Sequence, residues 1–226
     1  MISVTEAVTA RHSARAFLDR PVPRQTLEEI LALAARAPSG GNLQPWQVDV
    51  LTGAALAGLR ARVAASLAAN PAGEGTEFNV YPPALGEPWR SRRFASGEQL
   101  YAALGIGRED RPARLAQFAK NFEAFGAPVL LLFSLPRHFG PPQWAHLGMF
   151  MQNLMLLAAE RGLATCAQEA WALVHRTVAE TLGLGEDRLF YCGMALGFAD
   201  EAHPVNGWRT GRVPLEEFAR FAGFET

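Results

Sequence analysis

The sequence predicts a single domain, spanning residues 1–226, that contains both helices and strands. Helical and strand patterns interleave along the chain without strict alternation. Hydrophobic residues make up 49% of the 226 residues and charged residues 19%. This composition is typical of a globular protein, and the length is sufficient to bury a substantial core.

The first part of the chain predicts helices on either side of a strand. Ser3 and Glu6 have the spacing of a capping box, so a helix begins just after the serine. Hydrophobic and polar residues alternate over residues 46–53, as in a half-buried strand. Helical spacing of hydrophobic residues covers residues 27–34 and 54–69.

Residues 70–125 differ from the rest of the chain. They contain the stretch NPAGEGTEFNVYPPALGEPWRSRR and a charged helical run, REDRPARLAQFAKNF. Because this part lacks a dense apolar core of its own, we interpret it as an insertion or lid within the domain rather than as a second domain.

The second half predicts a central strand followed by a long apolar helix. Residues 127–134, APVLLLFS, form a continuous apolar run that is typical of a buried strand. Residues 144–162 are helical and apolar on nearly every face, which indicates a place in the core or in a subunit interface. The remaining elements are a helix from His175 to Leu182, a strand over residues 188–200 and a short helix over residues 214–223.

Charge and hydropathy exclude two classes of function. The formal net charge of −1 gives none of the basic surface that nucleic-acid binding requires. The N-terminal residues lack the apolar core of a signal peptide, and the apolar stretches are too short to span a bilayer. We therefore expect a cytoplasmic protein that does not bind membranes.

Residue usage argues against several kinds of catalytic site. Lys120 is the single lysine, so the chain has neither the Gly-Lys pair of a phosphate-binding loop nor a plausible Schiff-base lysine. The five histidines have no zinc-ligand spacing, and no metal site is expected. Cys166 and Cys192 lie among apolar residues and are expected to be buried free thiols.

The segment RHSAR carries the first candidate binding residues. Arg11, Ser13 and Arg15 lie just after the first predicted helix, where two guanidinium groups and a hydroxyl can converge on one anion. Arginine suits phosphate because its planar group donates two hydrogen bonds at once. A solvated basic patch would have the same sequence, so the segment alone leaves both interpretations open.

Three further segments carry candidate ligand groups. Residues 37–46, APSGGNLQPW, contain two glycines that allow the backbone to approach a flat ligand, although an ordinary loop has a similar composition. Residues 206–214, NGWRTGRVP, add two arginines between glycines. Residues 165–171, TCAQEAW, place Gln168 and Glu169 in a loop or at a strand end.

In this order, the four segments resemble the nitroreductase family of FMN-dependent flavoenzymes. Residues 11–53, from RHSARAFLD to WQVDVLTG, resemble the N-terminal signature of that family, and residues 191–221 resemble its C-terminal signature. The middle of the chain is similar to the branch that contains nitrobenzoate and related nitroaromatic reductases. The order of the motifs is more specific than any one of them.

The resemblance implies a fold, an assembly and a set of cofactor contacts. The fold would be α+β with a central mixed sheet flanked by helices, in an intertwined homodimer that holds two FMN molecules at its interface. The FMN phosphate and ribityl end would contact Arg11, His12, Ser13, Arg15 and Arg212, with Arg209 as a less certain match. The isoalloxazine edge would contact Pro38, Ser39, Gly40 and Asn42 from the other subunit, and flavin N5 would face the backbone near Gln168 and Glu169.

The same resemblance implies an oxidoreductase. A hydride would pass from NADPH or NADH through flavin N5 to a nitroaromatic or quinone-like acceptor, with no protein acid or base required. Tyr81, Trp89 and Phe94 would shape the acceptor pocket. Donor choice would rest on arginines such as Arg90, Arg92 or Arg93. Some relatives carry a lysine where this chain has Thr210, so the group that stabilises charge near flavin N1 stays open.

Other functions are compatible with the same residues. Some similar proteins dehalogenate iodotyrosines or fragment reduced flavin with oxygen. A third possibility is a non-catalytic module that binds FMN without turnover.

Overall fold

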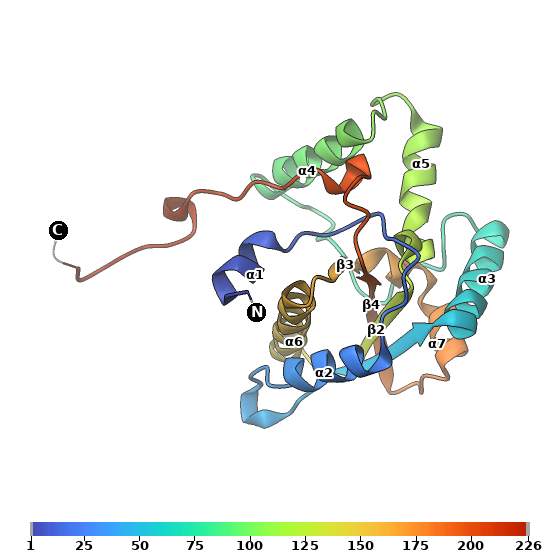
Figure 1. Ribbon diagram of the computed structural model, residues 1–226, viewed down its shortest axis with the longest axis horizontal. Coiled ribbons are helices and arrows are strands. Elements are labelled where there is room, and N and C mark those ends of the chain that lie inside the picture. Colours follow the sequence, from blue (N-terminus) through green and yellow to red (C-terminus); the bar gives the residue numbers. More distant parts are fainter. Residues whose placement is uncertain (1, 225–226) are drawn as a thin grey trace.

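The computed structural model describes residues 2–224, in which four strands form one sheet with helices on both faces (Figure 1). The strands are β1 (Gln47–Thr52), β2 (Val129–Pro136), β3 (Ala164–Gln168) and β4 (Arg188–Gly197), in the spatial order β1-β2-β4-β3. All three pairings are antiparallel. Within residues 2–224 the expected mixed sheet is therefore wrong, because parallel pairing in this range is limited to an isolated bridge between Ser13 and Thr165.

Most predicted helices are confirmed. The helices are α1 (Val4–Ala10), α2 (Arg24–Ala34), α3 (Gly53–Ala69), α4 (Trp89–Ala103), α5 (Arg111–Ala119), α6 (Pro141–Glu160) and α7 (His175–Leu182). Short 3-10 turns are η1 (Gly40–Asn42), η2 (Lys120–Gly126), η3 (Glu169–Val174), η4 (Pro204–Asn206) and η5 (Leu215–Glu217). The capping box between Ser3 and Glu6 is present. The predicted C-terminal helix is wrong: only η5 forms, because no buried residue anchors it.

Strand β2 explains why the sheet needs helices on both faces. All its residues except the last, Pro136, are buried, and all except Ser134 are apolar. Val129, Leu131 and Phe133 pack in the cluster that contains α2 and α6. Leu130 and Leu132 pack in the opposite cluster with α3, α7 and the 3-10 turns η2 and η3. Burial of each such side chain contributes about 1.5–3 kcal/mol.

A β-bulge in β4 changes which face its side chains occupy. Phe133 pairs with Cys192 and the next β2 residue, Ser134, pairs with Phe190, so Tyr191 has no partner in the register. Because of this extra residue, Tyr191 and Cys192 are both in the cluster on the α6 side, while Phe190 is on the other. Bulges commonly redirect side chains beside functional sites.

Residues 70–125 are attached to the body of the chain at their start. The carboxylate of Glu74 accepts a hydrogen bond from the backbone N–H of Arg176 at 2.7 Å and so caps α7. Helix α4 buries none of its residues, and a 2.7 Å ion pair between Arg114 and Glu98 joins it to α5. The role of this segment as an insertion or a lid stays a prediction.

Two kinds of feature are absent from residues 2–224. In this range no helix combines the length and the apolar character of a membrane span. No group of three or more His, Cys, Asp or Glu side chains in the same range is arranged to hold a metal ion. Cys166 and Cys192 are free and buried, as the sequence predicts.

Gly193→Ala is expected to lower the free energy of unfolding by about 1–3 kcal/mol, because the core around Trp171 is already filled. A Cβ at Gly193 would lie 2.6 Å from Trp171 Cδ1, and Trp171 is fully buried. Urea denaturation measures the change. Gly58→Ala is the control, since Gly58 is exposed on α3 and an added Cβ there meets nothing within 4 Å, so the change should be neutral or stabilising. Equal effects would contradict the packing argument.

Candidate functional site

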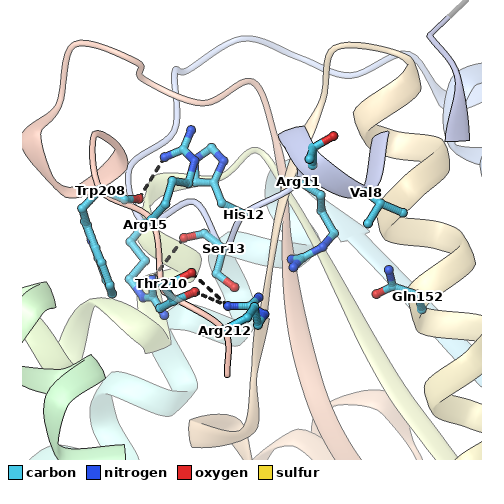
Figure 2. Close-up of a pocket in the computed structure, with 11 residues that line it drawn as sticks. Val8, Arg11, His12, Ser13, Arg15, Gln152, Trp208, Thr210 and Arg212 are labelled. Atoms are coloured by element: carbon cyan, nitrogen blue, oxygen red, sulfur yellow. Dashed lines mark hydrogen bonds between the residues drawn. The ribbon is translucent and has the colours of Figure 1, made fainter. Parts of the chain in front are cut away.

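The first cavity collects predicted binding residues from both ends of the chain. Its volume is about 470 Å³, and Figure 2 shows the side chains that line it. The lining residues are Val8, Thr9, Arg11, His12, Ser13, Arg15, Gln152, Trp208, Arg209, Thr210 and Arg212. Six of the residues expected to hold FMN are thus brought together: Arg11, His12, Ser13, Arg15, Arg209 and Arg212. We call this cavity the arginine cavity.

Backbone hydrogen bonds hold the N-terminal segment between β3 and the end of β4. The N–H of Ala14 donates to the carbonyl of Thr165 at 3.1 Å, and the N–H of Leu18 donates to that of Phe198 at 2.9 Å. These bonds place residues 11–15 beside the edge of the sheet. The segment therefore follows an extended path after α1, which allows alternate side chains to point into one cavity.

Asn206 joins the two ends of the chain and was missed by the sequence argument. Its side chain is 1% exposed. Its Oδ1 accepts a 2.8 Å hydrogen bond from the backbone N–H of Arg15, and its Nδ2 donates to the carbonyls of Ala16 at 2.8 Å and Asp200 at 2.9 Å. The buried amide therefore sets the position of Arg209 and Arg212, which follow it in the chain.

The positive charge of the arginine cavity is not neutralised by protein carboxylates. Within residues 2–224, none of Arg11, Arg15, Arg209 and Arg212 forms a salt bridge. Arg209 donates to the carbonyl of Asn206 at 2.6 Å, and Arg212 donates to the Thr210 hydroxyl at 2.8 Å. Burial, together with the nearby Arg212 guanidinium, lowers the pKa of Arg11. Such a cluster of cations favours a bound anion.

The geometry of the cavity leaves donors available for an anion. Figure 2 shows Arg11, Ser13 and Arg212 pointing toward a common space, with Gln152 of α6 at its side. His12 Nδ1 lies 3.3 Å from the Ala10 carbonyl oxygen, while its Nε2 is buried without a hydrogen-bond partner in residues 2–224. Burial lowers the pKa of His12. A bound anion would raise this pKa and convert Nε2 into a donor.

A second cavity lies at the end of β3. Its volume is about 590 Å³, and its aromatic lining comes from Tyr81, Phe118 and Tyr191. The other lining residues are Thr76, Asn79, Val80, Arg93, Asn121, Met151, Ala167, Gln168, Glu169, Ala170, Leu173 and Cys192. We call this the aromatic cavity. Of the three residues expected to shape an acceptor pocket, the structure brings in Tyr81 and leaves Trp89 and Phe94 exposed on α4.

Hydrogen bonds fix the β3 end of the aromatic cavity. Gln168 is buried, and its Nε2 donates to the Asn121 carbonyl at 2.9 Å. The Tyr191 hydroxyl donates to the Glu169 carboxylate at 3.2 Å. Burial raises the pKa of Tyr191, so the phenol keeps its proton at neutral pH. Tyr191 reaches this cavity because of the bulge in β4, which sequence periodicity does not reveal.

The two cavities are adjacent. The consecutive residues Met151 and Gln152 of α6 line the aromatic and the arginine cavity, respectively. Strand β3 also connects them, because Thr165 bridges to Ser13 and Gln168 lies three residues further on, about 10 Å along an extended chain. An elongated ligand with an anionic end and a flat end could therefore occupy both.

The glycine-rich loop lies outside both cavities of its own chain. Pro38 and Ser39 precede η1, and Gly40 and Asn42 are its first and last residues; η1 is exposed, and the N–H of Gly40 donates to His146 Nε2 on α6 at 3.2 Å. Asn42 has a φ of 55°, a conformation that asparagine tolerates better than most residues. The expected contact of this loop with a cofactor stays a prediction.

Comparison with known proteins identifies the family. The family model described as the nitroreductase family matches residues 8–198. The chain belongs to the nitroreductase family. This assignment explains why the segments with the arginines lie together although about 200 residues separate them.

Several characterised members of the nitroreductase family match over almost their full length. The chain is 36% identical over 218 residues to the chloronitrobenzene nitroreductase of Comamonas testosteroni, which covers 96% of each chain. It is 36% identical over 218 residues to the 4-nitrobenzoate reductase of Pseudomonas putida, covering 96% of this chain and 95% of the relative. The sequence identity to these relatives therefore extends over almost the whole chain and is not limited to the four segments with candidate ligand groups.

Solved nitroreductases share the fold. The crystal structure of the FMN and NADPH-dependent nitroreductase NfnB from Sphigopyxis sp. strain HMH is 50% identical, with a TM-score of 0.96 over 99% of this chain and 100% of that one. The FMN-dependent nitroreductase NfnB from Mycobacterium smegmatis, in complex with NADPH, is 30% identical with a TM-score of 0.91 over 97% of both chains.

Inorganic phosphate is expected to stabilise the ligand-free protein, since a dianion neutralises the arginine cavity. At about 100 times its dissociation constant, phosphate would add about 2.7 kcal/mol, measured by thermal unfolding against chloride at matched ionic strength. A tenfold to hundredfold loss of affinity in Arg212→Gln should reduce the gain to about 0.4–1.4 kcal/mol. Arg62→Gln, whose arginine pairs with Glu180 at 3.2 Å, should retain it. An equal gain in both variants would disprove an anion site here.

Proposed function

We propose that this chain is an FMN-dependent oxidoreductase that passes electrons from NADPH to nitroaromatic acceptors. The observation that carries the proposal is the uncompensated arginine cavity beside the aromatic cavity. Relatives named as FMN- and NADPH-dependent nitroreductases support the cofactor and the donor, and relatives named for nitrobenzene and nitrobenzoate support the acceptor.

The donor set of the arginine cavity fits the phosphate of FMN. Arg11 and Arg212 would neutralise the dianion, and Ser13 would donate a further hydrogen bond from its hydroxyl. Arg15 and Arg209 would supply additional positive charge. His12 lines the same cavity, and its Nε2 has no hydrogen-bond partner in the described chain.

The aromatic cavity would hold the flat ring and the acceptor. When bound there, FMN would supply the hydride-transfer chemistry. The backbone at Gln168 and Glu169 would lie along the flavin edge. The Tyr191 hydroxyl would keep its own proton and donate a hydrogen bond to the Glu169 carboxylate. Tyr81 and Phe118 would stack against an aromatic acceptor and exclude water.

The proposal includes a homodimer. Apolar side chains are exposed on α1 and along the C-terminal segment, which extends away from the rest of the chain (Figure 1). They are Val4, Val8, Leu215, Phe218, Phe221 and Phe224. Such exposure is rare on a monomer, and a second copy would cover it. In the dimer, Gly40 and Asn42 would contact the cofactor of the other subunit. We place the enzyme in the cytoplasm, where reduced nicotinamide cofactors are available.

The comparisons favour this function over a dehalogenase, a flavin-fragmenting enzyme or a non-catalytic flavin module. The experiment is anaerobic mixing of the yellow protein with NADPH, followed by addition of 4-nitrobenzoate. Bleaching and reoxidation of the bound flavin, with formation of hydroxylamino or amino products, is expected. No bleaching by NADPH or NADH would reject the proposal in favour of the binding module.

Arg11→Gln and Arg212→Gln are each expected to weaken FMN binding by about tenfold to a hundredfold, the usual effect of losing a hydrogen bond to a charged group. Quenching of FMN fluorescence on titration with cofactor-free protein measures the dissociation constant. Arg62→Gln controls for general loss of positive charge. Unchanged affinity in both cavity variants would exclude this phosphate position.

A mixed dimer tests whether the glycine-rich loop acts on the partner's cofactor. Asn42→Leu is expected to weaken FMN binding without unfolding the chain. Co-expression of an Arg11→Gln/Arg212→Gln protomer with an Asn42→Leu protomer, on different affinity tags, would create one intact site per dimer if the loop acts between subunits. FMN bound per purified heterodimer is the readout. Loss of tight binding at both sites would show that the loop acts within its own subunit.

A further inference from the structure

Helix α4 carries three arginines near its start, and they differ in their partners. Arg90 forms an ion pair with Glu87 at 2.8 Å, and Arg92 forms one with Glu217 at 2.6 Å. Arg93 forms no salt bridge to any residue in the range 2–224. Of the three, Arg93 is also the one that lines the aromatic cavity.

The position of Arg93 leaves its hydrogen-bond donors available. Its guanidinium carbon lies 4.1 Å from the centre of the Tyr81 ring. Contact with an aromatic face orients the planar guanidinium but uses none of its N–H groups. The tyrosine thus holds a cation at the wall of the cavity with donors ready for a planar anion.

The other charged residue of the aromatic cavity, Glu169, already has a hydrogen-bond partner. Among the lining residues, Arg93 and Glu169 are the charged ones. Glu169 accepts the hydroxyl hydrogen of Tyr191 and is not paired with Arg93 in the described chain. The cavity therefore presents the Glu169 carboxylate on Tyr191 and, beside Tyr81, the Arg93 cation, which forms no salt bridge within residues 2–224.

We propose that Arg93 binds the carboxylate of nitroaromatic acids and so makes this chain selective for acceptors with an anionic substituent. This inference rests on the proposed function, and it names the substrate class of the same site. A carboxylate carries one charge and matches one guanidinium through two parallel hydrogen bonds. The aromatic lining would contact the ring of the same molecule.

The phosphate of the nicotinamide dinucleotide is the other anion that Arg93 could meet. A phosphate dianion usually requires several donors and more than one positive charge, as the arginine cavity offers. The aromatic cavity offers one cation, which suits a monoanion on a ring. The carboxylate is therefore the better match, and donor kinetics serve as the test of the alternative.

The experiment compares 4-nitrobenzoate with nitrobenzene in the FMN-loaded enzyme. Arg93→Gln is expected to lower the ratio of kcat/KM for 4-nitrobenzoate to that for nitrobenzene by about tenfold to a hundredfold, mainly through KM for the acid. Arg90→Gln is the matched control, because it removes an arginine from the same helix that pairs with Glu87 and does not line the cavity. Its ratio should match that of the parent enzyme.

Two kinetic outcomes would overturn the inference. Equal losses for both acceptors in Arg93→Gln would mean that the arginine only supports the structure around Tyr81. A rise in KM for NADPH without a rise for NADH would mean that it binds the dinucleotide phosphate.

Benzoate binding separates this inference from the proposed function. Calorimetric titration of the FMN-loaded protein with benzoate needs no turnover. We expect benzoate to bind the parent and Arg90→Gln proteins, and Arg93→Gln to weaken binding by at least about tenfold. If nitroaromatics are not reduced but benzoate binding depends on Arg93, the proposed function fails and the carboxylate site stands. Benzoate binding that is unaffected by Arg93→Gln would refute the site.

Discussion

The buried amide of Asn206 is the interaction on which the arginine cavity depends. It connects the backbone at residues 15 and 16 with the chain that follows β4, through three hydrogen bonds of 2.8–2.9 Å. Each bond contributes about 0.5–1.5 kcal/mol, and losing the amide would also leave buried backbone groups without partners. The arginines of residues 11–15 and of residues 209–212 repel one another, so their side chains do not stabilise the contact between the two segments. The uncharged amide of Asn206 stabilises this contact through its hydrogen bonds.

Local physical rules made much of the fold predictable. Ser3 and Glu6 form a capping box, so a pair of residues three positions apart is enough to predict the start of α1. The continuous apolar run in β2 is likewise enough to predict a buried strand. The relative directions of the strands were harder to predict, because each pairing depends on residues far apart in sequence. The expected mixed sheet was therefore wrong. The prediction of a C-terminal helix was also wrong: PLEEFARFAG has the composition of a helix, but Phe218 is exposed and η5 has no buried residue.

Site residues were predictable where the residue types within one short segment already indicate what they bind. The arginines of RHSAR and NGWRTGR were recognisable as anion ligands by residue type, and the fold brings them together. Gln152 had a readable signal, since it and its neighbour Asn153 interrupt a largely apolar helix. Tyr191 and Asn206 had none: the first lines a cavity through a change of register, and the second acts through hydrogen bonds to distant backbone. Such roles follow from tertiary geometry rather than from composition or spacing.

The bulge at Tyr191 also determines how the chain can vary in length. A strand with one extra residue has opposite side-chain parity on either side of it. Deleting Tyr191 would remove the extra residue and restore regular alternation, so Phe190 would stay on the face of Trp171 and Cys192 on the opposite face. A one-residue deletion between Cys192 and Gly197 would instead exchange the two faces on one side of it and disturb both cores. A one-residue gap in this strand should therefore fall at Tyr191 among relatives rather than elsewhere in β4.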